Sequence, residues 1–185
     1  MKYFFYTLCL LYLHGELFAQ KAYSTVEIGI DGSWNINKNR FHQFWQVEPV
    51  PGLFFITPAP RGYYVVGLSR HVYHGSPSYT AYFPNTGWGM ALPVFSFLSW
   101  DNRVKIGNYF MLFGDYETNE TKNVESELGL TIETGFRISV SEKICIHTSL
   151  EYFRIYTRHP IELLFLSTGI SYRFDAPAWF RNFLK

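Results

Sequence analysis

The segment from Leu128 to Val140 changes side-chain character at every residue, and this feature restricts the fold more than any other. Its even positions are mainly large and apolar: Leu128, Leu130, Ile132, Thr134, Phe136, Ile138 and Val140. Its odd positions carry glycine, hydroxyl groups or charge: Gly129, Thr131, Glu133, Gly135, Arg137 and Ser139. Because successive side chains of a β-strand point to opposite faces, this period predicts a strand with one apolar and one polar face.

Other segments of the chain have comparable patterns, which brings the predicted total to eight strands. The additional segments are 23–34, 41–57, 62–73, 87–100, 103–117, 143–156 and 161–174. Proline is tolerated in a sheet mainly at edges and bulges, so the prolines of 41–57 make that strand the least regular. In 143–156 the apolar residues change faces after Phe153, which predicts a bulge or a strand end there.

The connections between these segments alternate in length. The short ones are 58–61, 101–102 and 141–142, whereas longer ones occupy 35–40, 74–86 and 118–124. Short turns on one side and long loops on the other are typical of a transmembrane β-barrel. We therefore predict an all-β fold, a closed antiparallel up-and-down barrel of about eight strands. The short turns and both chain ends would lie on the periplasmic side.

The chemistry of the polar face predicts which face points outward. A solvated face of a soluble sheet carries charge at most positions, but here glycine and hydroxyl groups dominate. Charged residues are only 17% of the chain, against about 25% in ordinary soluble domains. Several segments also exceed the about 9–11 residues that cross a bilayer. We expect the apolar face to contact lipid.

The charged residues of the polar face are then expected to pair inside a narrow lumen. The predicted network is Glu27, Asp31, Glu127, Glu133, Arg137, Glu151 and Arg173. One alternative remains open at this point. A secreted, soluble, lipocalin-like barrel would turn the same apolar face inward and bind an apolar ligand.

Residues 1–20 have the plan of a secretory signal peptide. Lys2 precedes an apolar run over 3–13, and the small residue Ala19 stands near a plausible cleavage point. The run is too short to span a bilayer, and a buried N-terminal helix is the alternative. We expect export, with the barrel formed by 21–174. Only Cys145 remains after cleavage, so no intramolecular disulfide is possible.

Residues 175–185 form a tail beyond the last predicted strand. Asp175 can cap a short helix that has Pro177 in its first turn. On such a helix four apolar residues group on one side: Trp179, Phe180, Phe183 and Leu184. We expect an amphipathic segment at the membrane interface. Docking of a periplasmic partner or closure of the barrel mouth are alternatives.

The sequence "TGISYRF", residues 168–174, resembles the closing strand of bacterial outer-membrane β-barrels, in which alternating apolar residues end in an aromatic. The mature chain resembles the family of small, eight-stranded barrels of this kind. The resemblance implies location in the outer membrane of a Gram-negative bacterium, among its lipids and lipopolysaccharide. It also implies recognition of the last strand by the barrel-assembly machinery, although the extension 175–185 departs from relatives that end at the aromatic.

A barrel of eight strands has an interior just filled by side chains, which argues against a wide pore. We therefore expect a structural or surface-interaction role, with an unknown surface or periplasmic protein as a possible partner. The loop predicted at 74–86, rich in Tyr, Ser and Pro, suits partner docking or packing over the barrel mouth. A net charge of +1 gives no electrostatic case for nucleic acid. The histidines show no metal-site spacing, and we expect no cofactor.

An enzymatic function is the alternative to a structural or surface-interaction role. His147 and Ser149, with Glu162 on the next strand, resemble the site of lipid A deacylases, which are small outer-membrane barrels. In that scheme His147 takes the proton of Ser149 while Glu162 orients the imidazole. Leu150 stands where that family has asparagine, and His147 falls on the lumen side near the periplasmic end. We therefore expect His147 and Ser149 to share structural hydrogen bonds with Glu151.

Overall fold

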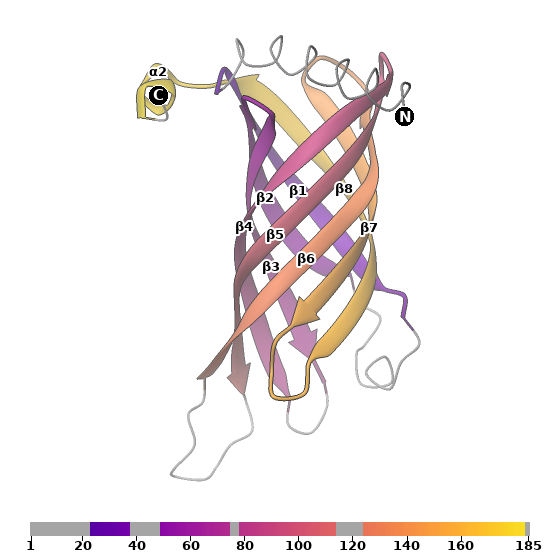
Figure 1. The fold of residues 1–185 in the computed structure, drawn as a ribbon, viewed down its shortest axis with the longest axis vertical. Coiled ribbons are helices and arrows are strands. Elements are labelled where there is room, and N and C mark those ends of the chain that lie inside the picture. The colour runs from indigo at the N-terminus through magenta and orange to yellow at the C-terminus, as the bar shows by residue number, and fades with distance from the viewer. Residues whose placement is uncertain (1–22, 38–48, 75–77, 114–123, 184–185) are drawn as a thin grey trace, which may run out of the picture.

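The computed structural model describes residues 23–37, 49–74, 78–113 and 124–183, with the side chain of Phe183 left out. Eight strands form one closed barrel in which each strand pairs antiparallel with its neighbours in sequence (Figure 1). The strands are β1 (Thr25–Asn35), β2 (Val50–Ala59), β3 (Gly62–Tyr73), β4 (Tyr79–Phe95), β5 (Leu98–Phe113), β6 (Val124–Ser139), β7 (Ile144–Ile155) and β8 (Ile161–Asp175). The short helix α2 (Ala178–Phe183) follows β8.

The barrel closes where the last strand meets the first. The β1–β8 register runs from Thr25↔Asp175 to Asn35↔Phe165, so the ladder covers the whole of β1. The segment 168–174 lies within this ladder, and its terminal Phe174 pairs with Val26. The predicted closed, antiparallel, up-and-down barrel is therefore confirmed. A closed barrel leaves no sheet edge with unpaired backbone groups.

Two connections differ from the prediction. Asp101 and Asn102, predicted to form a turn, are ladder residues of β5 that pair with Gly135 and Thr134. The chain instead turns between Phe95 and Leu98. The pair Asp-Asn is common in turns, but here the aspartate points inward and meets a charge partner. The predicted loop 74–86 is also wrong over its second half, because β4 already begins at Tyr79.

Strands β2 and β4 each contain two prolines, and one of these residues coincides with a gap in the ladder. In β4, pairing with β5 stops after Tyr82↔Phe110 and resumes at Asn85↔Gly107, which brackets Pro84. Proline has no N–H to donate, so a gap at this position is expected. In β2, Pro58 still faces Tyr63 of β3. Residues 41–48 of the proline-containing segment predicted at 41–57 lie outside the described residues.

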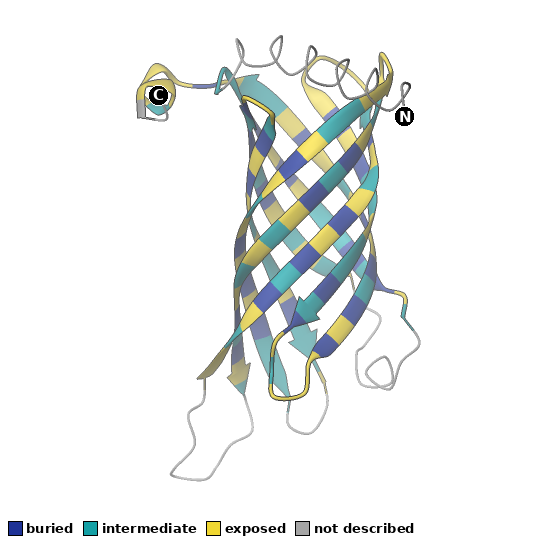
Figure 2. Ribbon diagram, in the orientation of Figure 1, coloured by how far each residue is buried: buried dark blue, intermediate teal, exposed yellow. Residues whose placement is uncertain are grey.

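Burial alternates along every strand (Figure 2). The outward positions are apolar and exposed, as Ile30 at 61%, Ile132 at 50% and Ile170 at 49% illustrate. The inward positions of the same strands, such as Glu27 and Glu133, are buried. The apolar face of the alternating pattern therefore points outward, as predicted. Within the described residues, no helix is long and apolar enough to cross a membrane.

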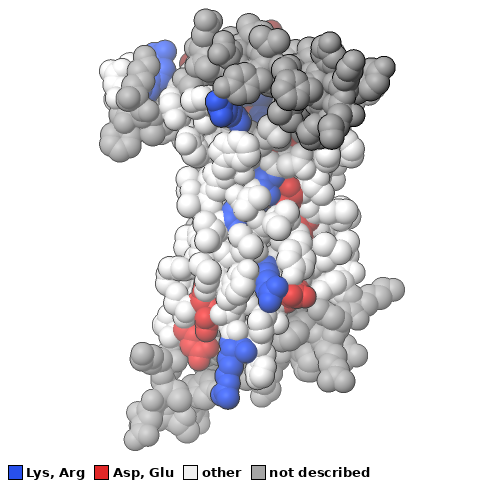
Figure 3. Space-filling model, in the orientation of Figure 1, with Lys and Arg blue, Asp and Glu red and all other residues white. Residues whose placement is uncertain are grey.

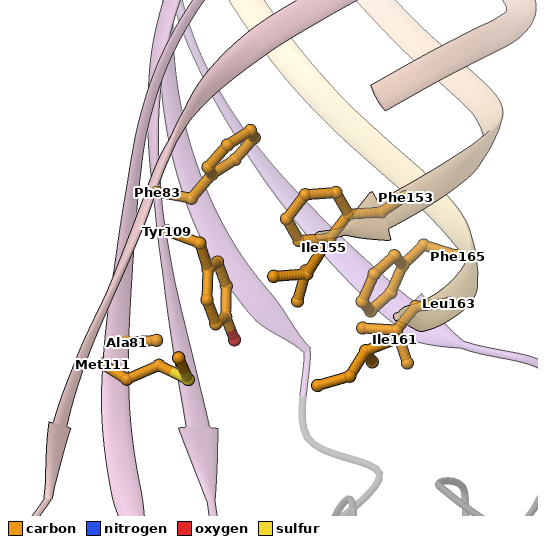
Figure 4. Close-up of a cluster of buried hydrophobic side chains, with 9 residues drawn as sticks. All are labelled: Ala81, Phe83, Tyr109, Met111, Phe153, Ile155, Ile161, Leu163 and Phe165. Carbon is orange, nitrogen blue, oxygen red and sulfur yellow. The ribbon is translucent and has the colours of Figure 1, made fainter. Parts of the chain in front are cut away.

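The lumen has an apolar part near the end of the barrel where β1 ends and β8 begins, called the loop end below (Figure 4). This apolar plug consists of Ala81, Phe83, Tyr109, Met111, Phe153, Ile155, Ile161, Leu163 and Phe165. It explains the change of pattern after Phe153. No bulge interrupts β7, whose register with β8 continues through Arg154↔Glu162 to Ile155↔Ile161. Of the two predicted explanations, the bulge is wrong, whereas the strand end lies close by, because β7 ends at Ile155. The faces keep their alternation up to that end, and the lumen becomes apolar there.

Candidate functional site

Glu27 is the centre of an ion cluster in the lumen, at the barrel end where β1 begins. Its carboxylate accepts hydrogen bonds from Arg137, from Arg173 at 3.4 Å and from the Ser171 hydroxyl at 2.6 Å. His147 Nε2 lies 3.2 Å from the same carboxylate. Only 3% of Glu27 is exposed. Four partners from β6, β7 and β8 thus compensate one buried charge, which the barrel closure brings beside them.

A second cluster begins one layer further into the lumen. Arg103 Nη2 lies 2.7 Å from Asp101 Oδ2, and its Nη1 lies 3.5 Å from Glu133 Oε1. The hydroxyl of Tyr63 donates to Asp101 and accepts from Arg103 Nε at 2.9 Å. The Arg103 guanidinium also lies 5.7 Å from the centre of the Phe54 ring. Each polar atom of this guanidinium therefore faces a lone pair or a ring.

Lys105 extends the ion network towards the apolar plug. Its Nζ lies 3.1 Å from Glu133 Oε2 and 3.7 Å from Glu151 Oε1. Ser149 donates to Glu133 at 2.9 Å, and Ser167 donates to Glu151 at 3.4 Å. Alternating acidic and basic side chains thus continue along the lumen. Removal of one partner from such a buried ion pair strongly destabilises the folded protein, because the other charge is left buried and unpaired.

The predicted lumen residues fall into two groups. Ion pairs include Glu27, Glu133, Arg137, Glu151 and Arg173. Asp31 lines the cavity described below, and Glu127 is half-buried opposite Tyr109 in the β5–β6 register.

Sequence reasoning missed the basic centre of the network. Arg103 and Lys105, with Asp101, occupy successive inward positions of β5, and Val104 lies between them on the outer face. This charged row on the inward face was a usable signal. It was overlooked because Asp101 was assigned to a turn.

The three residues of the hydrolase alternative lie apart. His147 Nε2 lies 2.7 Å from Ser171 Oγ, whereas Ser149 donates to Glu133. Glu162 lies on the outer surface near the loop end, half-exposed, where it pairs with Arg154 at 3.5 Å. The structure therefore brings His147 together with a different serine and a different carboxylate.

The serine that His147 does contact, Ser171, is also poorly placed for activation. Arg103 Nη2 lies 3.1 Å from His147 Nδ1. Because a guanidinium only donates, Nδ1 must accept this bond, and the hydrogen of the neutral ring stands on Nε2. A general base needs a free lone pair towards the nucleophile. His147 instead presents N–H to Ser171, and this arrangement suits a structural hydrogen bond.

The Ser149→Ala variant checks the hydrolase alternative directly. We expect the acyl-chain profile of lipid A, measured by mass spectrometry in cells expressing the variant, to equal that of cells expressing the unchanged chain. The variant removes one hydrogen bond to Glu133, so unfolding should become easier by about 1–3 kcal/mol. Loss of a deacylated species in the variant alone would restore the catalytic alternative.

The described part of the lumen contains a small cavity. A cavity of about 30 Å³ lies between the ion network and the apolar plug, lined among others by Asp31, His71, Asn85, Lys105 and Glu151. It accommodates about two water molecules. An apolar ligand of the kind a lipocalin binds does not fit this cavity. In the part of the chain that the structure describes, no group of three or more His, Cys, Asp or Glu could hold a metal ion.

Two of the predicted tail residues, Trp179 and Phe180, lie outside the lumen. Trp179 is 71% exposed, and Phe180 is partly buried with its ring centre 5.9 Å from that of Phe55. The side chain of Phe183 and the whole of Leu184 lie outside the described residues. The predicted cap is wrong, because Asp175 is the last residue of β8 and α2 begins only at Ala178.

Comparisons with known proteins give the class of the fold. No family model matches the chain, and no curated protein matches it significantly. Neisserial surface protein A has a TM-score of 0.62 at 12% identity, covering 81% of this chain and 96% of its own. The N-terminal barrel of Pseudomonas aeruginosa OprF has a TM-score of 0.51 at 13% identity, covering 83% and 99%.

Ail, the attachment invasion locus protein of Yersinia pestis, is similar to the same degree. Its TM-score is 0.51 at 15% identity, with 82% of this chain and 97% of Ail covered. At these identities the likeness concerns the fold. The chain has the fold of the small outer-membrane β-barrels, and the helix α2 follows its closing strand.

Proposed function

We propose that this chain is an integral outer-membrane β-barrel with a structural or surface-interaction role, and that it forms no wide pore. One observation supports this most: large apolar side chains are exposed on the outer face of all eight strands. One example from each strand is Ile30, Leu53, Val66, Trp88, Val104, Ile132, Leu150 and Ile170. On the face drawn in Figure 3, uncharged side chains form most of the coloured surface, and the charged side chains form a few small groups.

The physical reason is the solvent that such a surface requires. Soluble monomers rarely expose continuous apolar patches beyond a few hundred Å². A hydrocarbon environment tolerates the apolar face and requires every backbone polar group to be paired, which a closed barrel achieves. A membrane barrel must also keep its charged side chains away from lipid. The lumen does this, because its ion pairs lie inside the barrel.

The packing of the lumen supports the proposal that the barrel forms no wide channel. The apolar plug and the ion network leave about 30 Å³ of free volume between them. A porin needs a continuous aqueous path, which barrels of about 16 strands provide. The proposed role therefore depends on surfaces: the lipid-facing wall, the rim and the loops.

The proposed location gives the chain its partners. Lipids and lipopolysaccharide of the outer membrane would surround the wall, and the barrel-assembly machinery would read β8 during insertion. Export of the chain through residues 1–20 belongs to the same proposal. Two structural neighbours are named as a surface protein and an attachment protein, which agrees with a role at the cell surface.

Fractionation and single-channel recording check this proposal. The chain is expected in the outer-membrane fraction, to require detergent for extraction, and to migrate faster on a gel before heating than after it. In planar bilayers it is expected to produce no large, porin-like conductance steps. A monodisperse protein in detergent-free buffer would contradict the membrane location, and large steps would contradict the closed lumen.

A further inference from the structure

The helix α2 lies outside the barrel, at the end where β1 begins and β8 ends (Figure 1). Two backbone contacts fix its starting point. Ala176 is buried and donates its N–H to the carbonyl of Ser24 at 2.9 Å, and Arg181 N–H donates to the Pro177 carbonyl at 3.1 Å. The chain therefore leaves β8 beside β1 and begins its helix at the barrel rim.

The helix packs on the apolar outer wall through one aromatic contact. The rings of Phe180 and Phe55 meet edge to face at a centroid distance of 5.9 Å. Phe55 stands in one ladder row with Ile28 of β1 and Val66 of β3. These two neighbours are 42% and 54% exposed on the outer face. Phe180 thus continues the lipid-facing surface of the barrel.

The barrel does not cover the apolar side chain of Trp179 in α2. Trp179 contacts Phe180 edge to face at 5.7 Å, yet 71% of its surface is exposed. With about 100° between successive helical residues, Arg181 lies roughly opposite Trp179. An amphipathic segment with an aromatic on one side and arginine on the other suits the boundary between acyl chains and phosphate groups.

A second apolar feature stands at the same end of the barrel. The turn between β4 and β5 exposes Phe95 at 60% and Phe97 at 55%, with their rings stacked at 5.9 Å. The turn between β6 and β7 adds Val140, which is 60% exposed. Aromatic rings are enriched where a membrane barrel meets the water boundary. These turns lie on strands distant from β1 and β2, so apolar contacts occur on more than one side.

We propose that α2 lies flat in the periplasmic leaflet of the outer membrane, with Trp179 among the acyl chains and Arg181 at the lipid phosphates. The helix then anchors the barrel rim to that leaflet, and the occupant of its exposed apolar face is lipid. This proposal rests on the proposed membrane location. Its six helical residues give a segment of about 9 Å, which is enough for a local contact with the head-group layer.

A pair of fluorescent labels on opposite faces of α2 tests the proposal. Cys9 and Cys145 are replaced by serine, and a single cysteine is introduced as Trp179→Cys or as Arg181→Cys and labelled with an environment-sensitive dye. The full chain is folded into vesicles of phosphatidylcholine and phosphatidylglycerol. Nitroxide-bearing lipid is expected to quench the dye at 179 several-fold more than at 181, and aqueous iodide should show the opposite preference.

The controls separate this proposal from the membrane location. Vesicle flotation and heat-modifiable migration report whether the barrel itself is folded in the bilayer. If the barrel floats and is folded but both labels respond equally to iodide and not to nitroxide lipid, the helix lies in water and the anchor is refuted. If the chain does not float at all, the membrane location fails, and the anchor fails with it.

A second variant pair guards against loss of the native residue at 179. Trp179→Ser and Asn182→Ser each remove one exposed side chain of α2. Each is combined with the dye-labelled Arg181→Cys chain. Iodide quenching of a dye at Arg181→Cys is expected to rise in the first variant and stay unchanged in the second. Equal quenching in both would mean that Trp179 does not hold the helix at the lipid surface.

Discussion

Replacement of Glu27 by alanine is expected to lower the free energy of unfolding by about 3–5 kcal/mol, because it leaves the buried Arg137 guanidinium without its partner. Arg137 and Arg173 both pair with this carboxylate, which is only 3% exposed. The Ser171 hydroxyl loses its acceptor as well. Urea titration of the folded barrel in detergent micelles, followed by intrinsic fluorescence, measures the change.

Two comparisons identify the cause of this loss. Glu162→Ala removes an exposed pair with Arg154 and is expected to cost no more than about 1 kcal/mol. The double variant Glu27→Ala/Arg137→Ala should be less destabilised than the sum of the two single variants, since neither charge of that pair is then left alone. A loss below 1 kcal/mol for Glu27→Ala would mean that water reaches this part of the lumen freely.

The overall fold could be predicted because its signal is local. Alternation along a strand reports which face each residue occupies, and β3 was predicted with its observed bounds, Gly62–Tyr73. The outward position of Ile132 and Ile170 also follows from this period. Turns were predicted less well, because Asp101 has the chemistry of a turn residue but serves as a lumen charge. Local composition does not separate these two roles.

The partners inside the lumen could not be predicted from the same signal. Glu27 and Arg137 are 110 positions apart, and they meet because the barrel closes with a particular stagger of its strands. That stagger is a property of the whole barrel. For the same reason, the histidine contact with Ser171 was not anticipated, and the closer neighbour in sequence, Ser149, was considered instead.

The apolar plug shows a second limit of pattern reading. After Phe153 apolar residues occupy the inward face, and this change was interpreted as a bulge or a strand end. The interpretation assumed that the lumen is polar along its whole length. Phe153, Ile155 and Leu163 are in fact almost fully buried among one another. An interior can be filled by charge pairs at one level and by rings at another, provided that each level is packed and its polar groups are paired.

Replacement of Ile132 by arginine decides which solvent surrounds the barrel wall. Ile132 lies midway along β6 on the outer face, 50% exposed, and pairs with Val104 and Tyr152 of the adjacent strands. In a membrane barrel, arginine on the lipid side near the bilayer centre costs about 2–4 kcal/mol. On a water-exposed wall the same change would remain within about 0.5 kcal/mol. Guanidinium unfolding from phosphatidylcholine vesicles measures the difference.

Val124→Arg is the matched control for this experiment. Val124 is the first residue of the same strand and is 48% exposed, so it differs from Ile132 mainly in its position along the barrel axis. At the interface the cost of arginine falls to about 0–1 kcal/mol, because the side chain reaches water and phosphate groups. A membrane barrel therefore predicts a large loss for Ile132→Arg and a small one for Val124→Arg. Equal and small effects at both positions would contradict the claim that lipid surrounds the barrel wall. Protein would then have to cover the apolar wall instead.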